Sequence, residues 1–237
     1  QVTVTKDAQQ ALTIVGGHRT VTYGHADLQL QTSGGSGNGK VTWESSDPDV
    51  ASIDAATGKV TIHQAGEATI TAIKAGDDQY DPSPAHITVT VNKAKLTVKA
   101  ENKTREYGKP NPALTYKITG FVNGEDKTVL TRQPAIAVDS DIPAEELPVG
   151  SYAIKVEGGE AENYRFDYQA GTLTVTKTGQ APLSILQGSQ IDKTYGDGAF
   201  TLSVTGGSGN GKVTWASSDN SIASVDHEGK VTIHKSG

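Results

Sequence analysis

The ten residues GGSGNGKVTW occur twice in this chain, at residues 34–43 and again at residues 206–215. Upstream, Tyr23-Gly24 precedes the first copy by the same spacing at which Tyr195-Gly196 precedes the second. Downstream, the first copy continues as ESSDPDVASIDAATGKVTIHQAG and the second as ASSDNSIASVDHEGKVTIHKSG, with one residue deleted. Near-identity over this length does not arise by chance, so the sequence contains a duplicated domain.

A different unit lies between the two copies. It opens with KLTVKAENKTREYG and closes with NYRFDYQAGTLTVTK, and it carries a Tyr-Gly pair of its own at Tyr107-Gly108. Strand-like runs bounded by turn residues fill every unit. The repeat spacing therefore predicts domains at residues 7–92, 93–178 and 179–237.

Both ends of the chain carry partial units. TVTK at residues 3–6 repeats the last strand of the middle unit, so we expect residues 1–6 to be the closing strand of a preceding unit. The second copy stops at Gly237, the equivalent of Gly66. We therefore expect 179–237 to be C-terminally incomplete, lacking two strands that either its own chain or another molecule supplies.

Composition points to an all-β protein. Short runs rich in valine, isoleucine and threonine alternate with turn residues, among them 27 glycines and nine prolines. We expect tandem immunoglobulin-like β-sandwiches in an elongated array, joined by short linkers. The net charge of −6 argues against nucleic-acid binding, and no apolar stretch is long enough to cross a bilayer. Cysteine is absent, which excludes disulfides and thiolate metal sites.

Aromatic residues repeat at fixed places and are predicted to be structural. Trp43 and Trp215 lie on V-T-W strands, and we expect both to be core residues; the alternative is a sugar-stacking platform. Tyr23, Tyr107 and Tyr195 each precede a glycine once per unit, which favours an architectural core role, with surface recognition as the alternative.

Three other patterns resemble chemical sites. The string Gly34-x4-Gly39-Lys40 imitates a phosphate-binding loop, but a strand follows it instead of Ser or Thr and a helix, so we interpret it as a connection. His63 and His234 stand alone at strand ends and make weak zinc ligands. The acidic group Asp77, Asp78 and Asp81 is the best calcium candidate, with a solvated turn as the alternative; no other cofactor is expected.

The motifs resemble two families of bacterial repeat domains. The series VTWESSDPDVASIDAATGKVTIHQAGEATITA resembles bacterial Ig-like group 2 domains of the invasin/intimin-like class. The strings EYGKPNPALTYKITGFVNGED, PVGSYAIKVEG and NYRFDYQAGTLTVTK resemble MBG-type, or YGX-type, domains. The resemblance implies tandem modules of a large bacterial surface protein, often an adhesin, with no catalytic residues to carry over.

The expected function is therefore a non-enzymatic, extracellular stalk or spacer that projects a distal region from the cell surface. One alternative is an adhesive module that binds host glycans, mucin or matrix proteins. Another is an assembly subunit that self-associates by strand complementation, in which one chain completes the sheet of its neighbour. Neighbouring repeats of the same chain are expected partners in every case, and nucleic acid is not.

Overall fold

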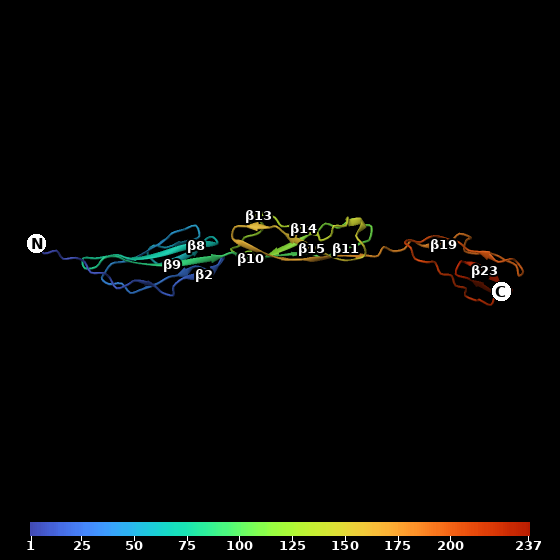
Figure 1. Cartoon of the computed structure of the whole chain (residues 1–237), viewed down its shortest axis with the longest axis horizontal. Helices are drawn as coiled ribbons and strands as arrows, with labels where there is room; N and C mark the ends of the chain where they lie inside the picture. The colour runs from blue at the N-terminus through green and yellow to red at the C-terminus, as the bar shows by residue number, and fades with distance from the viewer. The chain divides into compact units, whose positions relative to one another are not determined.

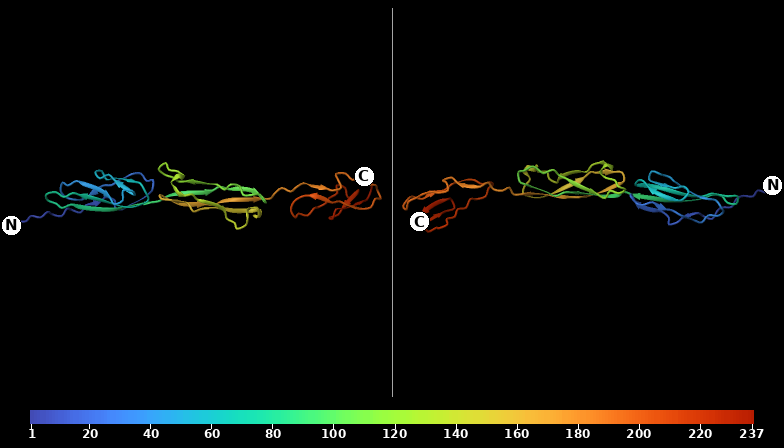
Figure 2. Two further views of the ribbon diagram at one scale, coloured as in Figure 1. Left: turned by 90° about the horizontal axis from the view of Figure 1, so that it is seen from above. Right: turned by 180° about the vertical axis from the view of Figure 1, so that it is seen from behind.

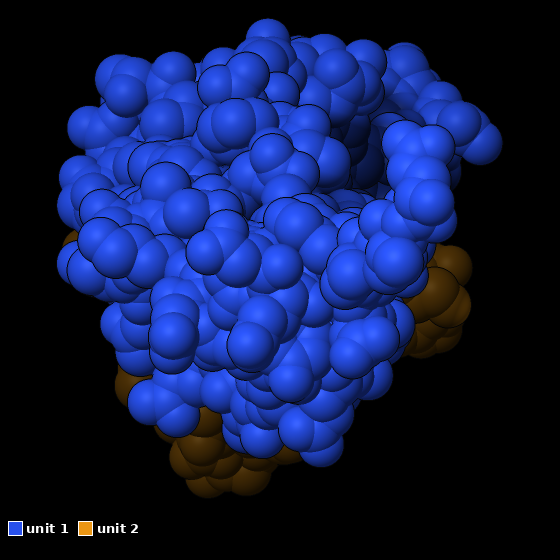
Figure 3. All heavy atoms as spheres, turned by 90° about the vertical axis from the view of Figure 1, so that its left-hand side faces the viewer, with its two compact units in different colours: residues 1–176 blue, residues 177–237 orange.

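The computed structural model describes all 237 residues, and they form two compact units, residues 1–176 and 177–237. Figure 3 colours these units separately. The all-β prediction is confirmed: the ribbon consists of strands and connections with only two short 3-10 turns (Figures 1 and 2). The structure contains no helix that is long and apolar enough to span a bilayer.

The first sandwich of the larger unit is built from nine strands that pair only among themselves. Its main sheet has the order β2-β9-β8-β5, faced by β3-β7-β6 and the small pair β1-β4. The strands are β1 (Thr13–Ile14), β2 (Arg19–Thr22), β3 (Leu28–Gln29), β4 (Thr32–Ser33), β5 (Val41–Ser45), β6 (Ala51–Ile53), β7 (Lys59–Ile62), β8 (Gly66–Lys74) and β9 (Ser83–Asn92).

Strict alternation in the sequence explains the core of this sandwich. On β8, Ala68, Ile70 and Ala72 are at most 1% exposed, while the residues between them lie outside the core. The side chains of a strand point to opposite faces in turn, so this spacing puts Ala68, Ile70 and Ala72 together on the face that packs into the core. β9 repeats the pattern, and its antiparallel register with β8 runs from Gly66↔Val91 to Lys74↔Ser83.

The second sandwich contains the next nine strands and two single-turn 3-10 helices. Its sheets have the orders β11-β18-β15-β14 and β12-β10-β17, with the pair β13-β16. The strands are β10 (Ala94–Ala100), β11 (Lys103–Glu106), β12 (Tyr116–Thr119), β13 (Leu130–Arg132), β14 (Ala135–Val138), β15 (Gly150–Glu157), β16 (Glu160–Ala161), β17 (Tyr164–Gln169) and β18 (Gly171–Thr176), with η1 (Lys127–Val129) and η2 (Ala144–Glu146).

One hydrophobic cluster continues from the first sandwich into the second. Val91 at the end of β9, Ala94 and Leu96 on β10, and Tyr164 on β17 all belong to it. Lys93 is the only residue between β9 and β10. The predicted boundary between residues 92 and 93 therefore falls inside one compact unit, because apolar side chains are shared across it.

The smaller unit holds the second copy of the repeat. Its strands are β19 (Leu183–Ile185), β20 (Phe200–Thr201), β21 (Val204–Gly206), β22 (Ala223–Val225) and β23 (Lys230–Ile233), in the sheets β19-β21 and β20-β23-β22. Residues 1–6 form no strand, and Val2 and Val4 are 90% and 89% exposed. That these residues close a preceding unit stays a prediction.

Candidate functional site

The candidate site is the joint between the two sandwiches, and it begins with the turn that follows β2. The amide of His25 donates to the carbonyl of Thr22 at 2.9 Å, which closes a four-residue turn. Gly24 in the third position has φ +88°, the left-handed conformation that this type of turn requires. The amide of Tyr23 donates to the carbonyl of Asn92 at 2.8 Å, so the turn is fixed to the end of β9.

Tyr23 projects its ring into the second sandwich. The ring meets Tyr164 edge-on, with centroids 5.6 Å apart and planes at 85°. Phe121 also meets Tyr164 edge-on, with centroids 5.7 Å apart and planes at 73°. Edge-to-face contacts of this kind stabilise aromatic clusters beyond the area that they bury. Tyr23 and Tyr164 are only 6% and 2% exposed, so both rings are core groups of the joint.

Glu125 joins the two phenols. Tyr23 donates its hydroxyl proton to Glu125 Oε1 at 2.8 Å, and Tyr164 donates to Glu125 Oε2. The Tyr164 hydroxyl accepts in turn from the amide of Val122 at 3.1 Å. Burial, with the bond to Glu125, raises the pKa of Tyr164 to about 12. Burial also raises the pKa of Tyr23, so both groups remain neutral donors at physiological pH.

Hydrogen bonds around Asn163 and Lys93 also hold the joint. Its side-chain oxygen accepts from the amide of Ala65 in the first sandwich at 2.9 Å. Its carbonyl accepts from the amide of Ala94 at 2.9 Å. Lys93 also donates its ammonium to the carbonyl of Ala161 at 3.2 Å. A one-residue linker with this many fixed bonds leaves little freedom for a hinge.

The five aromatic residues that were predicted to be core differ in how far they are buried. Trp43 is 7% exposed and packs on the Gly58 turn, and Trp215 is partly exposed. The core prediction is wrong for Tyr107 and Tyr195, which are 47% and 68% exposed. The reason is that the Tyr-Gly turn directs its ring beyond the end of its own sheet, so burial depends on what lies there.

The acidic candidates for calcium do not form a cluster. Asp77 accepts from the amides of Gln79 and Tyr80 through Oδ1 and from the amide of Asn38 through Oδ2, each at 2.9 Å. These bonds lower the pKa of Asp77, as in a solvated turn. Asp78 and Asp81 are not gathered with it into a set of metal ligands, and the chain has no group of three His, Asp or Glu side chains that fits a metal ion. Calcium binding stays a prediction.

The glycine-rich segment and the paired histidines have structural contacts. Gly34, Gly35 and Gly37 have positive φ, and the segment leads into strand β5 with no helix. His63 forms a hydrogen bond with the Ser52 hydroxyl at 2.7 Å, and the second copy repeats this pair with Ser224 and His234 at 2.8 Å. Each histidine is exposed and directly follows the last residue of a strand.

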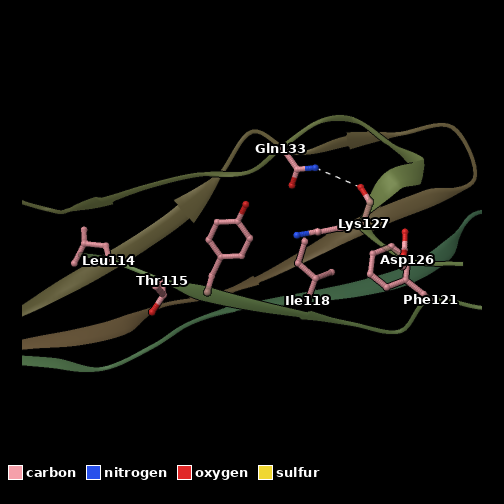
Figure 4. A pocket seen from close by; sticks show the side chains of 8 residues that line it. Leu114, Thr115, Ile118, Phe121, Asp126, Lys127 and Gln133 are labelled. Atoms are coloured by element: carbon pink, nitrogen blue, oxygen red, sulfur yellow. Dashed lines mark hydrogen bonds between the residues drawn. The ribbon is translucent and has the colours of Figure 1, made fainter. Parts of the chain in front are cut away.

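A surface hollow of about 630 Å³ opens beside the joint, on the side of β12 (Figure 4). Leu114, Ile118 and Phe121 line it along the β12 segment, and the facing connection contributes Lys127 and Gln133. The Gln133 amide donates to the carbonyl of Lys127 at 3.3 Å. The hollow combines apolar walls with a polar rim, as small-ligand sites do. It is completed by Thr115, Tyr116 and Asp126.

Sequence reasoning missed the residues that build the joint. Glu125, Asn163 and Tyr164 lie within the strings FVNGED and NYRFDY, which were used only as family markers. It also missed Arg105, which is 7% exposed and has no carboxylate partner; it donates to Asn111 Oδ1 at 2.7 Å and to the carbonyl of Ala144. A lone basic residue in a short strand gives no sign that it is buried.

Three family models match separate segments of the chain. The bacterial Ig-like domain (group 2) model matches residues 25–80, and the MBG domain (YGX type) model matches residues 96–174. The intimin immunoglobulin-like domain model matches residues 202–237. Each match covers less than half of the chain. The three families are Ig-like domains of adhesins and structural proteins and not enzymes.

Similar proteins include intimins of enteric bacteria. The intimin of Escherichia coli O127:H6 is 44% identical over 54 residues, which are 23% of this chain and 6% of that protein. The intimin of Citrobacter freundii is 35% identical over 85 residues, which are 34% of this chain and 9% of that protein. The chain therefore spans less than a tenth of the length of these two relatives.

A solved structure of an intimin fragment in complex with the intimin-binding domain of the translocated intimin receptor is also similar. It is 31% identical, with a TM-score of 0.29, and the match covers 40% of this chain and 36% of the fragment. As the sequence motifs predicted, the chain is a run of β-domains that match the bacterial Ig-like (group 2), YGX-type MBG and intimin immunoglobulin-like families.

Proposed function

We propose that this chain is a spacer segment of a bacterial cell-surface protein of the adhesin type, which extends a distal region and transmits tension to it. The single observation that carries the proposal is the pairing of terminal strands. In both complete sandwiches, a strand near the start of the domain lies parallel to its last strand. The intimin-like matches support the surface location.

The pairing suits a domain that is pulled from its two ends. β2 pairs with β9 from Arg19↔Val89 to Thr22↔Asn92, and β11 pairs with β18 from Lys103↔Leu173 to Glu106↔Thr176. Tension pulls parallel neighbours in opposite directions along their axes. The backbone hydrogen bonds between them are then loaded together in shear, and the ladder must break as a group.

Single-molecule stretching of the full chain between its termini tests this function. We expect two unfolding events at high force, one for each complete sandwich. Residues 177–237 are an internal control because all their strand pairs are antiparallel, and we expect them to extend at lower force. The proposal fails if both sandwiches of the larger unit extend at forces as low as those of the control.

A second candidate is an adhesive module that binds a host glycan, mucin or matrix protein. The hollow beside β12 favours it, because aromatic and aliphatic walls with a charged rim can bind a sugar ring or a peptide side chain. Saturable binding of the chain to immobilised mucin, fibronectin or laminin, lost in Tyr116→Ser and kept in Lys155→Ala on the opposite sheet, is the expected result. Equal binding by both variants would remove the hollow as the site.

A third candidate is an assembly subunit that acts by strand complementation. The exposed Val2 and Val4 favour it, together with an apolar hollow of about 270 Å³ in the smaller unit that includes Ile191, Phe200 and Val231. Sedimentation over a wide range of concentrations tests this candidate. Oligomers that grow with concentration and disappear in Val2→Asp/Val4→Asp would support it, and a monomer at every concentration would end it.

A further inference from the structure

The same hydrogen-bonded turn occurs three times in the chain, once in each sandwich of the larger unit and once in the smaller unit. In each, the fourth amide donates to the first carbonyl, across residues 22–25 at 2.9 Å, 106–109 at 3.3 Å and 194–197 at 3.0 Å. Tyrosine occupies the second position and glycine the third, and the glycines have φ of +88°, +74° and +101°. The turn is therefore built by local sequence and is already formed wherever the pair occurs.

Burial of the tyrosine does not follow from the turn. Tyr23 is 6% exposed and Tyr195 is 68% exposed, although their turns are the same. The ring contact of Tyr23 is with Tyr164, and its hydroxyl bond is with Glu125. Both residues belong to the next sandwich, so the following domain buries Tyr23.

We propose that the turn at residues 194–197 is a docking surface for the pole of an MBG-type domain, of the kind that Glu125, Tyr164 and Val122 form. This occupant offers three groups that the turn requires. A carboxylate accepts the phenol proton, an aromatic edge meets the tyrosine ring, and a small aliphatic side chain lies over the glycine. The joint between the first and second sandwiches shows this arrangement. Val122 approaches Gly24 so closely there that an added Cβ would lie 2.7 Å from it.

The turn of the second copy keeps the features that the joint uses. Thr194, Tyr195 and Gly196 match Thr22, Tyr23 and Gly24 in identity. A Cβ at Gly196 meets nothing within 4 Å, so the space that Val122 occupies over Gly24 is open there. The fourth residue changes from His25 to Asp197, and the Asp197 carboxylate is engaged within the turn by the amide of Thr194 at 2.9 Å.

This inference rests on the proposed spacer function, because it identifies the repeated turn as the place where one domain of the spacer packs on the next. Its failure would leave the stretching behaviour of the two complete sandwiches intact. The test uses two lengthened chains. One adds residues 67–92 after Gly237, which supplies most of β8 and all of β9 without an MBG pole. The other adds residues 67–178, which also supplies the pole.

Nitration by tetranitromethane, followed residue by residue with mass spectrometry, reports the accessibility of Tyr195 against Tyr23 in the same molecule. In the longer chain we expect the reactivity of Tyr195 to fall about tenfold, the ratio of the exposed fractions of 68% and 6%. Replacement of the appended Glu125 by alanine should return this reactivity, while Glu145→Ala in the appended domain should not.

Each remaining outcome counts against the proposal. Protection of Tyr195 in the shorter lengthened chain would mean that its own sandwich buries it. Full reactivity in both lengthened chains would mean that the turn does not dock on an MBG pole. Protection that is insensitive to the appended Glu125→Ala would mean that the carboxylate does not accept a hydrogen bond from the Tyr195 hydroxyl.

Discussion

The two copies of the repeat have nearly the same sequence and fold differently. In the first copy, VTWES forms strand β5 and pairs with β8 from Val41↔Lys74 to Ser45↔Ile70. In the second copy, the equivalent VTWAS at residues 213–217 forms no strand, and Val213 is 37% exposed. The first V-T-W segment thus has β8 as its hydrogen-bonded neighbour, whereas residues 213–217 pair with no strand. Strand formation by V-T-W therefore depends on its neighbours in the sheet and not on its own β-propensity.

One contact survives in both copies and shows what is local. Trp43 packs on Gly58 and Trp215 packs on Gly229, with an added Cβ 2.9 and 3.0 Å from the indole. Both glycines have positive φ, so the turn and the tryptophan recognise each other without the rest of the sheet. The remaining burial of Trp43 comes from the other strands of the first sandwich, of which β8 pairs directly with the strand that carries it. This difference can be tested by paired substitutions in the two copies.

The largest expected effect is the loss of the tryptophan. Trp43→Ala should lower the free energy of unfolding of the first sandwich by about 4 kcal/mol, because it empties a closed core. Trp215→Ala should cost about 1 kcal/mol, since that ring is only partly covered. Hydrogen exchange measured by mass spectrometry resolves the two units. Equal costs in the two copies would show that β8 and β9 add little to the burial of the tryptophan.

The next largest effect distinguishes the contact between the two sandwiches at Gly24 from the backbone strain that both turns share. Gly24→Ala and Gly196→Ala both place a side chain in the left-handed region, at a cost of about 1 kcal/mol. Gly24→Ala should cost about 2 kcal/mol more, because its Cβ would overlap Val122. Urea denaturation of both variants measures the difference. Equal destabilisation would contradict the close approach of the two sandwiches at Val122.

Alkaline pH should weaken the joint. An ordinary tyrosine loses its proton near pH 10, whereas Tyr164 keeps its proton up to about pH 12 in the folded chain. Between these values the unfolded state binds fewer protons than the native state, so the free energy of unfolding falls as pH rises. The contribution is fully present below pH 10, and roughly 2–3 kcal/mol is lost by about pH 12. Denaturation at several pH values should show a shallower fall for Tyr164→Phe, and parallel curves would contradict this linkage.

The smallest effect isolates one hydrogen bond. Tyr23→Phe keeps the ring and removes the proton donated to Glu125, so it should cost about 1–2 kcal/mol. Tyr195→Phe should be neutral within measurement error, since that hydroxyl lies on an exposed side chain. Thermal unfolding of the two variants makes the comparison. A similar cost at both positions would mean that the bond to Glu125 adds nothing specific.

The sequence predicted what local patterns determine. The repeat predicted the duplicated unit, and the runs of valine, isoleucine and threonine between turn residues predicted an all-β fold. The glycine-rich string was correctly interpreted as a connection, because a strand and not a helix follows Lys40. These inferences needed only neighbours along the chain.

The joint could not be predicted in this way. Tyr23 and Glu125 are separated by 102 residues, and no periodicity links them. The burial of Tyr23 depends on the domain that follows, so the assumption that all three Tyr-Gly tyrosines are core failed at Tyr107 and Tyr195. The motif strings did mark the right segments, but a family motif does not say which of its residues meet another domain.

The orientation of the two sandwiches in the larger unit tests the central claim most directly. Residual dipolar couplings measured for residues 7–92 and for residues 93–176 give an alignment tensor for each sandwich. We predict one shared tensor in the native chain and two different tensors in Tyr23→Ala, because the ring and its bond to Glu125 hold the joint. Two different tensors in the native chain would contradict a fixed joint.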